Sequence, residues 1–419
     1  MDSLKIIGGK KLRGTIQISG AKNAALPLMA CGLLLDSGEL KLSSMPDLAD
    51  TKSMSLLLYS LGIEVKNSNN ITTILGEPKS HIAAYDIVRK MRASVLVLGP
   101  LLTRCGIAKV SLPGGCSIGT RPVDLHIKAF EQMGAKITLS EGYIEAKAPK
   151  NGLYGAEIIF PIISVGATEN TIMAASLAKG KTTIVNAAKE PEIVDLSNCL
   201  NSMGANIKGA GTNTVTIEGV KKLHGCSHKV ISDRIEAGSF AIAASITGGE
   251  LELTDCNPTH LSSLSTHLIN SGVSWQNDEN SIKVSSNGNL KPISIKTEEY
   301  PGFPTDLQAQ FMTLMCIANG ESQISETIFE NRFMHVPELT RMGAKISVNG
   351  GTAKVIGVER LNGARLMATD LRASISLVIA ALSAKGESII SRIYHLDRGY
   401  EKLEEKLIKC GANIKRIED

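Results

Sequence analysis

The chain has 419 residues, of which 43% are hydrophobic and 21% are charged, and its formal net charge is +4. This length is too great for one ordinary hydrophobic core, and this composition is typical of globular proteins, so we expect two or three domains. The positive charges are spread along the chain without a run of lysine and arginine, which argues against a nucleic-acid-binding surface but allows small anionic ligands.

The N-terminal segment MDSLKIIGGKKLRG has no apolar stretch of the kind found in signal peptides. No segment approaches the roughly 18 uncharged apolar residues that a membrane span needs. The eight cysteines form no CxxC pair and have no nearby histidine at zinc-ligand spacing. We therefore expect a cytoplasmic protein with reduced thiols, no metal site and no membrane insertion.

After two short strand-like segments, LKIIGG and GTIQISG, which could belong to either half, one pattern occurs six times. Each copy begins with an Ala- and Leu-rich segment that is apolar nearly all round and ends in glycine, which predicts a buried helix. A short strand and an amphipathic helix follow, and alternating strands close most copies. The predicted buried segments begin, in chain order, at Ala21, Met91, Val165, Ile235, Pro304 and Leu371.

A glycine marks the end of each amphipathic helix, and the spacing of these glycines is between 68 and 72 residues. Such regular spacing predicts tandem structural repeats. Six repeats divide naturally into two groups of three, each near the upper end of normal domain size. The segment Gly225–Ser232 lies at the midpoint and is the predicted crossover between the groups. The six glycines are Gly62, Gly134, Gly204, Gly272, Gly343 and Gly411.

Polar and charged residues cluster where the six buried helices are predicted to begin. Helix N-termini carry unpaired N–H groups and partial positive charge, so several of them could bind phosphates or carboxylates. Asp306 and Asp370 could equally be ordinary N-caps. The cations Lys22, Arg92 and Arg372 oppose the helix dipole, however, and their positions favour anion binding.

The second repeat differs from the others by the inserted segment LPGGCSIGTRPVDLH, which spans Leu112–His126. Two adjacent glycines predict a loop, with Cys116 close to Arg121. Neighbouring cations favour the reactive thiolate form of a loop cysteine. The alternative is a small apolar residue packed under a turn, and composition alone leaves both interpretations open.

These segments resemble the UDP-N-acetylglucosamine 1-carboxyvinyltransferases, a family of enolpyruvyl transferases. The resemblance covers essentially the whole chain, and its ordered motifs make it highly specific. Besides the Cys116 loop, the matching motifs are GAKNAALP (Gly20–Pro27), RKMRASVLVLGPL (Arg89–Leu101), SVGATENTIMAA (Ser164–Ala175), KEPEIVDL (Lys189–Leu196), DRIEAGSF (Asp233–Phe240), PGFPTDLQAQF (Pro301–Phe311), ENRFMHVPEL (Glu330–Leu339), ATDLRAS (Ala368–Ser374) and HLDRGYE (His395–Glu401).

The resemblance implies an α/β (α+β) fold, a two-domain inside-out α/β barrel built from six βαβαββ repeats, three per domain. One domain would comprise residues 21–229 and carry the Cys116 loop. The other would combine residues 1–20 with residues 230–419. The family's active site lies in the cleft between the domains and requires no metal or organic cofactor.

The resemblance also implies roles for individual residues. Cys116 matches the acid that protonates phosphoenolpyruvate and the position alkylated by fosfomycin, and Asp306 matches the carboxylate at the sugar 3′-hydroxyl. Lys22, Arg121 and Arg398 match the residues that hold phosphoenolpyruvate. Further positions around the reacting centre are Asn23, Arg92, Arg332, Asp370 and Arg372. Matches to the nucleotide-sugar contacts, besides Arg121, are Pro122, Val123, Asp124, Leu125, Ser164, Val165, Gly166 and Ile328.

The implied reaction moves the enolpyruvyl group of phosphoenolpyruvate to UDP-N-acetylglucosamine with release of phosphate, the first committed step of peptidoglycan synthesis. These two small molecules are the only expected partners, and the sequence predicts no oligomeric state. The chain departs from the family pattern at Ile162, where many members carry lysine. Two alternatives are enolpyruvyl transfer to shikimate 3-phosphate and a non-catalytic anion-binding paralogue.

Overall fold

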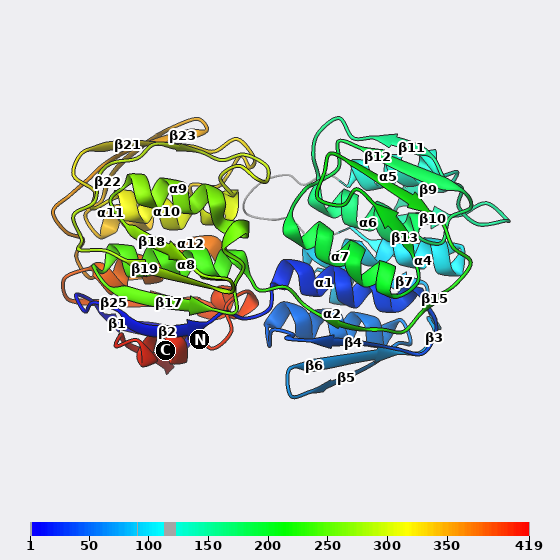
Figure 1. Cartoon of the computed structure of the whole chain (residues 1–419), viewed down its shortest axis with the longest axis horizontal. Coiled ribbons are helices and arrows are strands. Elements are labelled where there is room, and N and C mark those ends of the chain that lie inside the picture. Colours follow the sequence, from blue (N-terminus) through cyan, green and yellow to red (C-terminus); the bar gives the residue numbers. More distant parts are fainter. Residues whose placement is uncertain (1, 90, 113–122, 419) are drawn as a thin grey trace. The chain divides into compact units, whose positions relative to one another are not determined.

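The computed structural model describes residues 2–89, 91–112 and 123–418. These residues form two compact units, each with its own hydrophobic core (Figure 1). The N-terminal unit lies between Gly20 and Ile231, and the C-terminal unit combines the residues up to Ser19 with those from Ser232 onward. Within the described ranges, no helix is both long and apolar enough to cross a membrane.

Three buried helices fill the core of the N-terminal unit. They are α1 (Lys22–Cys31), α4 (Leu98–Cys105) and α6 (Val165–Ala175), and a 3-10 segment, η2 (Arg92–Val97), leads into α4. Helix α6 packs against both α1 and α4. Helices that are apolar on every side must be buried on every side, which explains their central position.

The C-terminal unit repeats this arrangement with α8 (Arg234–Ile246), α10 (Gln308–Met315) and α12 (Leu371–Ser383). These helices pack against one another, and a 3-10 turn, η4 (Thr305–Leu307), precedes α10. In Figure 1 the strands of this unit lie outside the helices. The six predicted buried helices are therefore confirmed, and the second and fifth begin with a 3-10 turn.

In the described part of the chain, six four-stranded sheets share one arrangement, in which a parallel strand pair is extended by two antiparallel strands, which form a hairpin in every sheet except the one that contains β1 and β26. Three sheets come from continuous stretches. Their strands are β7 (Ile82–Ala83), β8 (Ile107–Ser111), β9 (Lys136–Ser140) and β10 (Tyr143–Lys147); β11 (Glu157–Ile159), β12 (Lys181–Val185), β13 (Asn206–Lys208) and β14 (Thr214–Glu218); and β20 (Ile295–Lys296), β21 (Glu321–Ser325), β22 (Lys345–Asn349) and β23 (Thr352–Ile356).

The other three sheets take one strand from a distant part of the sequence. Their orders are β16-β4-β6-β5, β18-β19-β17-β2 and β24-β25-β1-β26. The strands are β1 (Asp2–Ile7), β2 (Arg13–Gln17), β4 (Glu39–Ser43), β5 (Glu64–Ser68), β6 (Ile71–Leu75), β16 (Ser227–Lys229), β17 (Glu250–Thr254), β18 (Ser274–Asn277), β19 (Ser281–Ser285), β24 (Arg365–Met367), β25 (Glu387–Ser391) and β26 (Asn413–Glu418).

These exchanges show how the chain passes between its halves. The N-terminal strand β1 pairs with β25 and β26, and β2 pairs in parallel with β17, so both belong to the C-terminal unit. Strand β16 lies inside the predicted crossover but pairs with β4, and the chain leaves the N-terminal unit only after Ile231. Strand β15 (Leu223–His224), which precedes β16, also belongs to the N-terminal unit, where it pairs in parallel with β3 (Leu35–Ser37).

The six regularly spaced glycines each follow an outer helix and have φ between 92° and 102°. A side chain at such a φ would be strained, whereas glycine adopts it freely and ends the helix. The repeat therefore reflects one helix-ending turn used six times. The outer helices are α2 (Ala49–Ser60), α5 (Asp124–Gln132), α7 (Pro191–Ser202), α9 (Ser262–Asn270), α11 (Val336–Arg341) and α13 (Leu403–Lys409).

Candidate active site

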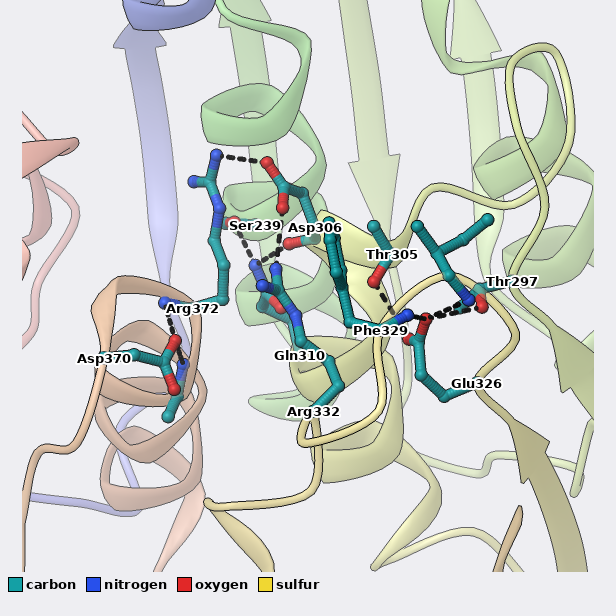
Figure 2. Close-up of polar contacts among 12 residues, drawn as sticks. Ser239, Thr297, Thr305, Asp306, Gln310, Glu326, Phe329, Arg332, Asp370 and Arg372 are labelled. Atoms are coloured by element: carbon teal, nitrogen blue, oxygen red, sulfur yellow. Dashed lines mark hydrogen bonds and ion pairs between the residues drawn. The ribbon is translucent and has the colours of Figure 1, made fainter. Parts of the chain in front are cut away.

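In the C-terminal unit, the Asp306 carboxylate lies between two arginines (Figure 2). Asp306 is in the 3-10 turn before α10, Arg332 is in the loop between β21 and α11, and Arg372 is in the first turn of α12. Arg332 Nη2 donates to Asp306 Oδ1 at 2.6 Å, and Arg372 Nη2 donates to Asp306 Oδ2 at 2.7 Å. Both arginine side chains are at most 7% exposed, while that of Asp306 is 24% exposed. The two buried arginines thus fix the Asp306 carboxylate, which remains partly accessible to solvent.

The charged state of Arg372 depends on its contact with Asp306. Burial disfavours the charged form of Arg372, but the adjacent Asp306 carboxylate overcomes this and raises the pKa of Arg372 above its ordinary value. Two guanidinium groups and one carboxylate have a net charge of +1 in their ordinary ionisation states. The group can therefore attract an anion while it offers a carboxylate oxygen as a proton acceptor.

A second layer of polar side chains supports Asp306 and Arg372. Gln310 Nε2 donates to the Asp306 carbonyl oxygen at 2.9 Å and to Ser239 Oγ at 3.2 Å. Ser239 Oγ is 2.8 Å from Tyr400 Oη, and Tyr400 Oη accepts from Arg372 Nη1 at 3.5 Å. Burial raises the pKa of Tyr400 to about 12, so its hydroxyl remains protonated at neutral pH. Sequence reasoning missed these three residues, although all of them lie within matched motifs.

The structure distinguishes the two aspartates for which an N-cap was an open alternative. Asp370 Oδ1 accepts from the backbone N–H groups of Arg372 at 2.9 Å and Ala373 at 3.1 Å, so Asp370 is the N-cap of α12. Asp306 makes no such cap; the turn it occupies follows Pro304, and its carboxylate contacts arginines instead. Arg398 ends the 3-10 segment η5 (Ile393–Arg398) of the same unit.

In the N-terminal unit, Lys22 is the first residue of α1 and its ammonium is 2.8 Å from Asp50 Oδ2. Asp50 lies in the first turn of α2 and is almost fully buried. This ion pair offsets the unfavourable position of a cation at a helix N-terminus. Asn23 follows Lys22 and is exposed, and Arg92 begins η2.

The structure brings two predicted contact segments together, because α5 packs against α6. Val123, Asp124 and Leu125 lie at the start of α5, and the next residue is His126. Ser164 caps α6 by accepting from Ala167 N–H at 3.3 Å, and Val165 and Gly166 form its first turn. A Cβ built at Gly166 would lie 3.5 Å from the His126 ring, an ordinary van der Waals distance, so the starts of α5 and α6 lie close together.

Three predicted site residues, Cys116, Arg121 and Pro122, lie outside the residues that the structure describes. Their roles remain predictions. Ile162, which replaces the lysine of many family members, lies two residues before the N-cap of α6 and is 63% exposed. Unlike lysine, an exposed isoleucine supplies no charge at this position.

Each unit contains one buried histidine that is neutral at physiological pH. Burial lowers the pKa of His126 to about 4, and it also lowers that of His335 to about 4. His126 Nδ1 is 3.0 Å from Asn170 Nδ2, and His335 Nε2 is 3.3 Å from Met312 Sδ. Between pH 6.5 and pH 4 the unfolded chain binds more protons at these positions than the folded chain, so stability falls as the pH falls.

We therefore expect His335→Leu to weaken the pH dependence of unfolding. Between pH 6.5 and pH 5 the wild type should lose about 1.5 kcal/mol of unfolding free energy through His335, and the variant should not. Urea unfolding at a series of pH values measures this, with His224→Asn as a control because His224 is exposed. Equal pH slopes for wild type and His335→Leu would contradict the expectation.

Comparison with known proteins identifies the relatives of this chain. A sequence profile described as EPSP synthase (3-phosphoshikimate 1-carboxyvinyltransferase) matches residues 6–407. The chain is 58% identical over 420 residues to the UDP-N-acetylglucosamine 1-carboxyvinyltransferase of Granulibacter bethesdensis. It is 56% identical over 431 residues to that of Rhodospirillum centenum, and both alignments cover 100% of each chain.

Two solved structures share the fold. The enolpyruvyl transferase NikO from Streptomyces tendae superposes with a TM-score of 0.89 over 99% of this chain and 98% of its own, at 24% sequence identity. EPSP synthase from Acinetobacter baumannii superposes with a TM-score of 0.78 over 100% of both chains, at 19% identity. At these identities the likeness shows the fold, and the predicted fold class is confirmed.

Proposed function

Because the chain belongs to the EPSP synthase family and, within it, to the UDP-N-acetylglucosamine 1-carboxyvinyltransferases, we propose that it transfers the enolpyruvyl group of phosphoenolpyruvate to the 3′-hydroxyl of UDP-N-acetylglucosamine. The observation that carries this proposal is the identity of 56–58% to relatives of that name over the full length of both chains. This reaction would begin peptidoglycan synthesis. The relatives at this identity do not favour shikimate 3-phosphate as the acceptor.

The chemistry requires an acid, a base and cations. Carbon 2 of phosphoenolpyruvate becomes electrophilic when carbon 3 is protonated, a role we assign to Cys116. The attacking sugar hydroxyl must lose its proton, which we assign to Asp306 because its carboxylate is ionically held yet partly accessible. Addition gives a tetrahedral intermediate, and loss of phosphate restores the double bond.

The positive groups would stabilise the phosphate and carboxylate charges of phosphoenolpyruvate. We assign this role to Lys22, Arg121 and Arg398, supported by Arg92, Arg332 and Arg372. We assign nucleotide-sugar binding to the starts of α5 and α6 and to the loop after β21, where N-terminal N–H groups can bind a diphosphate. Asn23 and Asp370 complete the proposed surroundings of the reacting atoms. No step of this mechanism calls for a metal ion or an organic cofactor.

Phosphate release from phosphoenolpyruvate, measured with each acceptor, tests the proposal. We expect release with UDP-N-acetylglucosamine and none with shikimate 3-phosphate. Release with shikimate 3-phosphate alone would indicate the sister reaction. Release with neither acceptor, although phosphoenolpyruvate binds, would indicate a non-catalytic anion-binding protein.

A separate prediction concerns Cys116. In the free protein, alkylation of this thiol by fosfomycin should become faster as the pH rises, and bound nucleotide sugar should move this dependence to higher pH because anions disfavour the thiolate. Mass spectrometry of labelled peptides at each pH measures the rate. Cys105→Ser provides the background, because Cys105 is exposed, and Cys116→Ala should remove the labelling. An identical pH dependence with and without the nucleotide sugar would contradict the prediction.

A further inference from the structure

A buried carboxylate outside the proposed catalytic set connects two segments of the C-terminal unit. Glu326 follows β21 directly, and the residue is 6% exposed. Its Oε1 accepts from Thr297 Oγ1 at 3.0 Å and from the backbone N–H groups of Ile328 at 2.9 Å and Phe329 at 3.1 Å. Its Oε2 accepts from Thr305 Oγ1 at 2.9 Å. Four donors compensate for the burial of this side chain.

The two oxygens of Glu326 serve different parts of the site. Oε1 fixes the turn that carries Ile328, while Oε2 fixes Thr305, the residue immediately before Asp306. One side chain therefore connects the loop after β21 to the turn that presents Asp306, and Figure 2 shows the contacts on both sides of Glu326.

Arg332 contacts residues on both sides of this connection, Phe329 and Asp306. The guanidinium carbon of Arg332 lies 5.4 Å from the centre of the Phe329 ring, and its Nη2 donates to Asp306 Oδ1 at 2.6 Å. Glu326 therefore holds both Asp306, through Thr305, and the arginine that binds the Asp306 carboxylate, through Phe329. If the contact through Thr305 or the contact through Phe329 is lost, the distance between the Asp306 carboxylate and the Arg332 guanidinium is no longer fixed.

We propose that Glu326 is a positioning residue for the enolpyruvyl transfer, which sets the placement of Asp306 against Arg332; this inference rests on the proposed function. A base works only within hydrogen-bond reach of the proton it removes, and a displacement of about 1 Å can lower the rate by roughly 10²-fold. Glu326 touches neither the reacting atoms nor the carboxylate of Asp306. It acts on Asp306 through the hydroxyl of Thr305 and on Arg332 through the turn that carries Phe329.

The test uses three variants of the full chain. Glu326→Ala removes both acceptors and should lower kcat by about 10²-fold. Glu326→Gln keeps the three contacts of Oε1, and Thr305→Val removes only the contact of Oε2, so each should lower kcat by roughly tenfold or less. The matched control is Glu321→Gln, because Glu321 lies on the same strand in an exposed pair with Lys354 and should leave kcat unchanged.

The pH profile separates positioning from a loss of folded protein. A weakened contact between Arg332 and Asp306 favours protonation of the carboxylate, so the acidic limb of kcat should move to higher pH in Glu326→Ala and Thr305→Val. Because stability itself falls at acid pH, each rate is divided by the folded fraction measured at the same pH, and a loss of folded protein alone then leaves the acidic limb unshifted. Should Glu326→Ala fail to fold, Thr305→Val still decides the question, because it removes only the contact of Oε2 and carries the same expected shift. If the wild type is active but the acidic limb of kcat is unshifted in the variants, only the positioning role is wrong. If the wild type is inactive, the proposed function and this inference are both wrong.

Discussion

Replacement of Asp306 by asparagine should lower kcat by about 10²- to 10⁴-fold, the contribution expected of a general base. The amide cannot accept the proton of the sugar hydroxyl, and it presents an NH₂ group to one of the two guanidinium groups that now contact carboxylate oxygens at 2.6 and 2.7 Å. Steady-state kinetics with saturating phosphoenolpyruvate and UDP-N-acetylglucosamine measure the effect. The KM values should change much less than kcat, because the lost interaction operates mainly in the transition state.

The same variant should also be less stable, since Arg332 and Arg372 are buried and lose their shared counterion. Asp306 is partly exposed, so the loss should be about 1–3 kcal/mol, below the full value for a buried ion pair. Urea unfolding gives this value, with Glu321→Gln as a neutral control. A variant of reduced stability that kept wild-type kcat would show that Asp306 is a structural counterion and not the base.

The sequence was sufficient to predict the repeated architecture because that architecture depends on local patterns. Apolar helices, alternating strands and a helix-ending glycine are visible within a few neighbouring residues. The position of Gly62 or Gly343 needs only the left-handed conformation that each adopts. The sixfold pattern follows from these local requirements.

The strand exchanges and the support of Asp306 depend on contacts between distant residues, and local patterns do not reveal them. Nothing in GTIQISG indicates that β2 pairs with β17. Ser239 and Tyr400 are 161 positions apart, and Glu326 lies 21 positions after Thr305. Local patterns also left Asp306 and Asp370 equivalent, because a carboxylate at a helix start can cap that helix or face a ligand, and only the family resemblance gave them different roles. In the structure, the cap hydrogen bonds of Asp370 and the contacts of Asp306 with two arginines separate them.

The second prediction of a large kinetic effect concerns Lys22 in the N-terminal unit. Lys22→Ala should lower kcat/KM for phosphoenolpyruvate by about 10²- to 10³-fold, as expected when a cation that stabilises developing phosphate charge is removed. The Lys22 side chain is only 13% exposed and its ammonium is 2.8 Å from Asp50 Oδ2, so a purely structural ion pair is the competing interpretation. Initial rates at subsaturating phosphoenolpyruvate, corrected for the folded fraction, measure the effect.

Asp50→Asn distinguishes the two interpretations, because it removes the charge of the partner and keeps its shape. If Lys22 binds the substrate phosphate, Asp50→Asn should change kcat/KM by less than about tenfold, and the double variant should remain as impaired as Lys22→Ala. If Lys22 serves only to neutralise a buried carboxylate, Lys22→Ala should reduce stability without changing the kinetics of the folded enzyme. In that case Asp50→Asn should restore the stability of the double variant, since no buried charge would then lack a counterion. A kinetic defect that persists when both charges are gone can therefore arise only from the lost contact between Lys22 and the substrate.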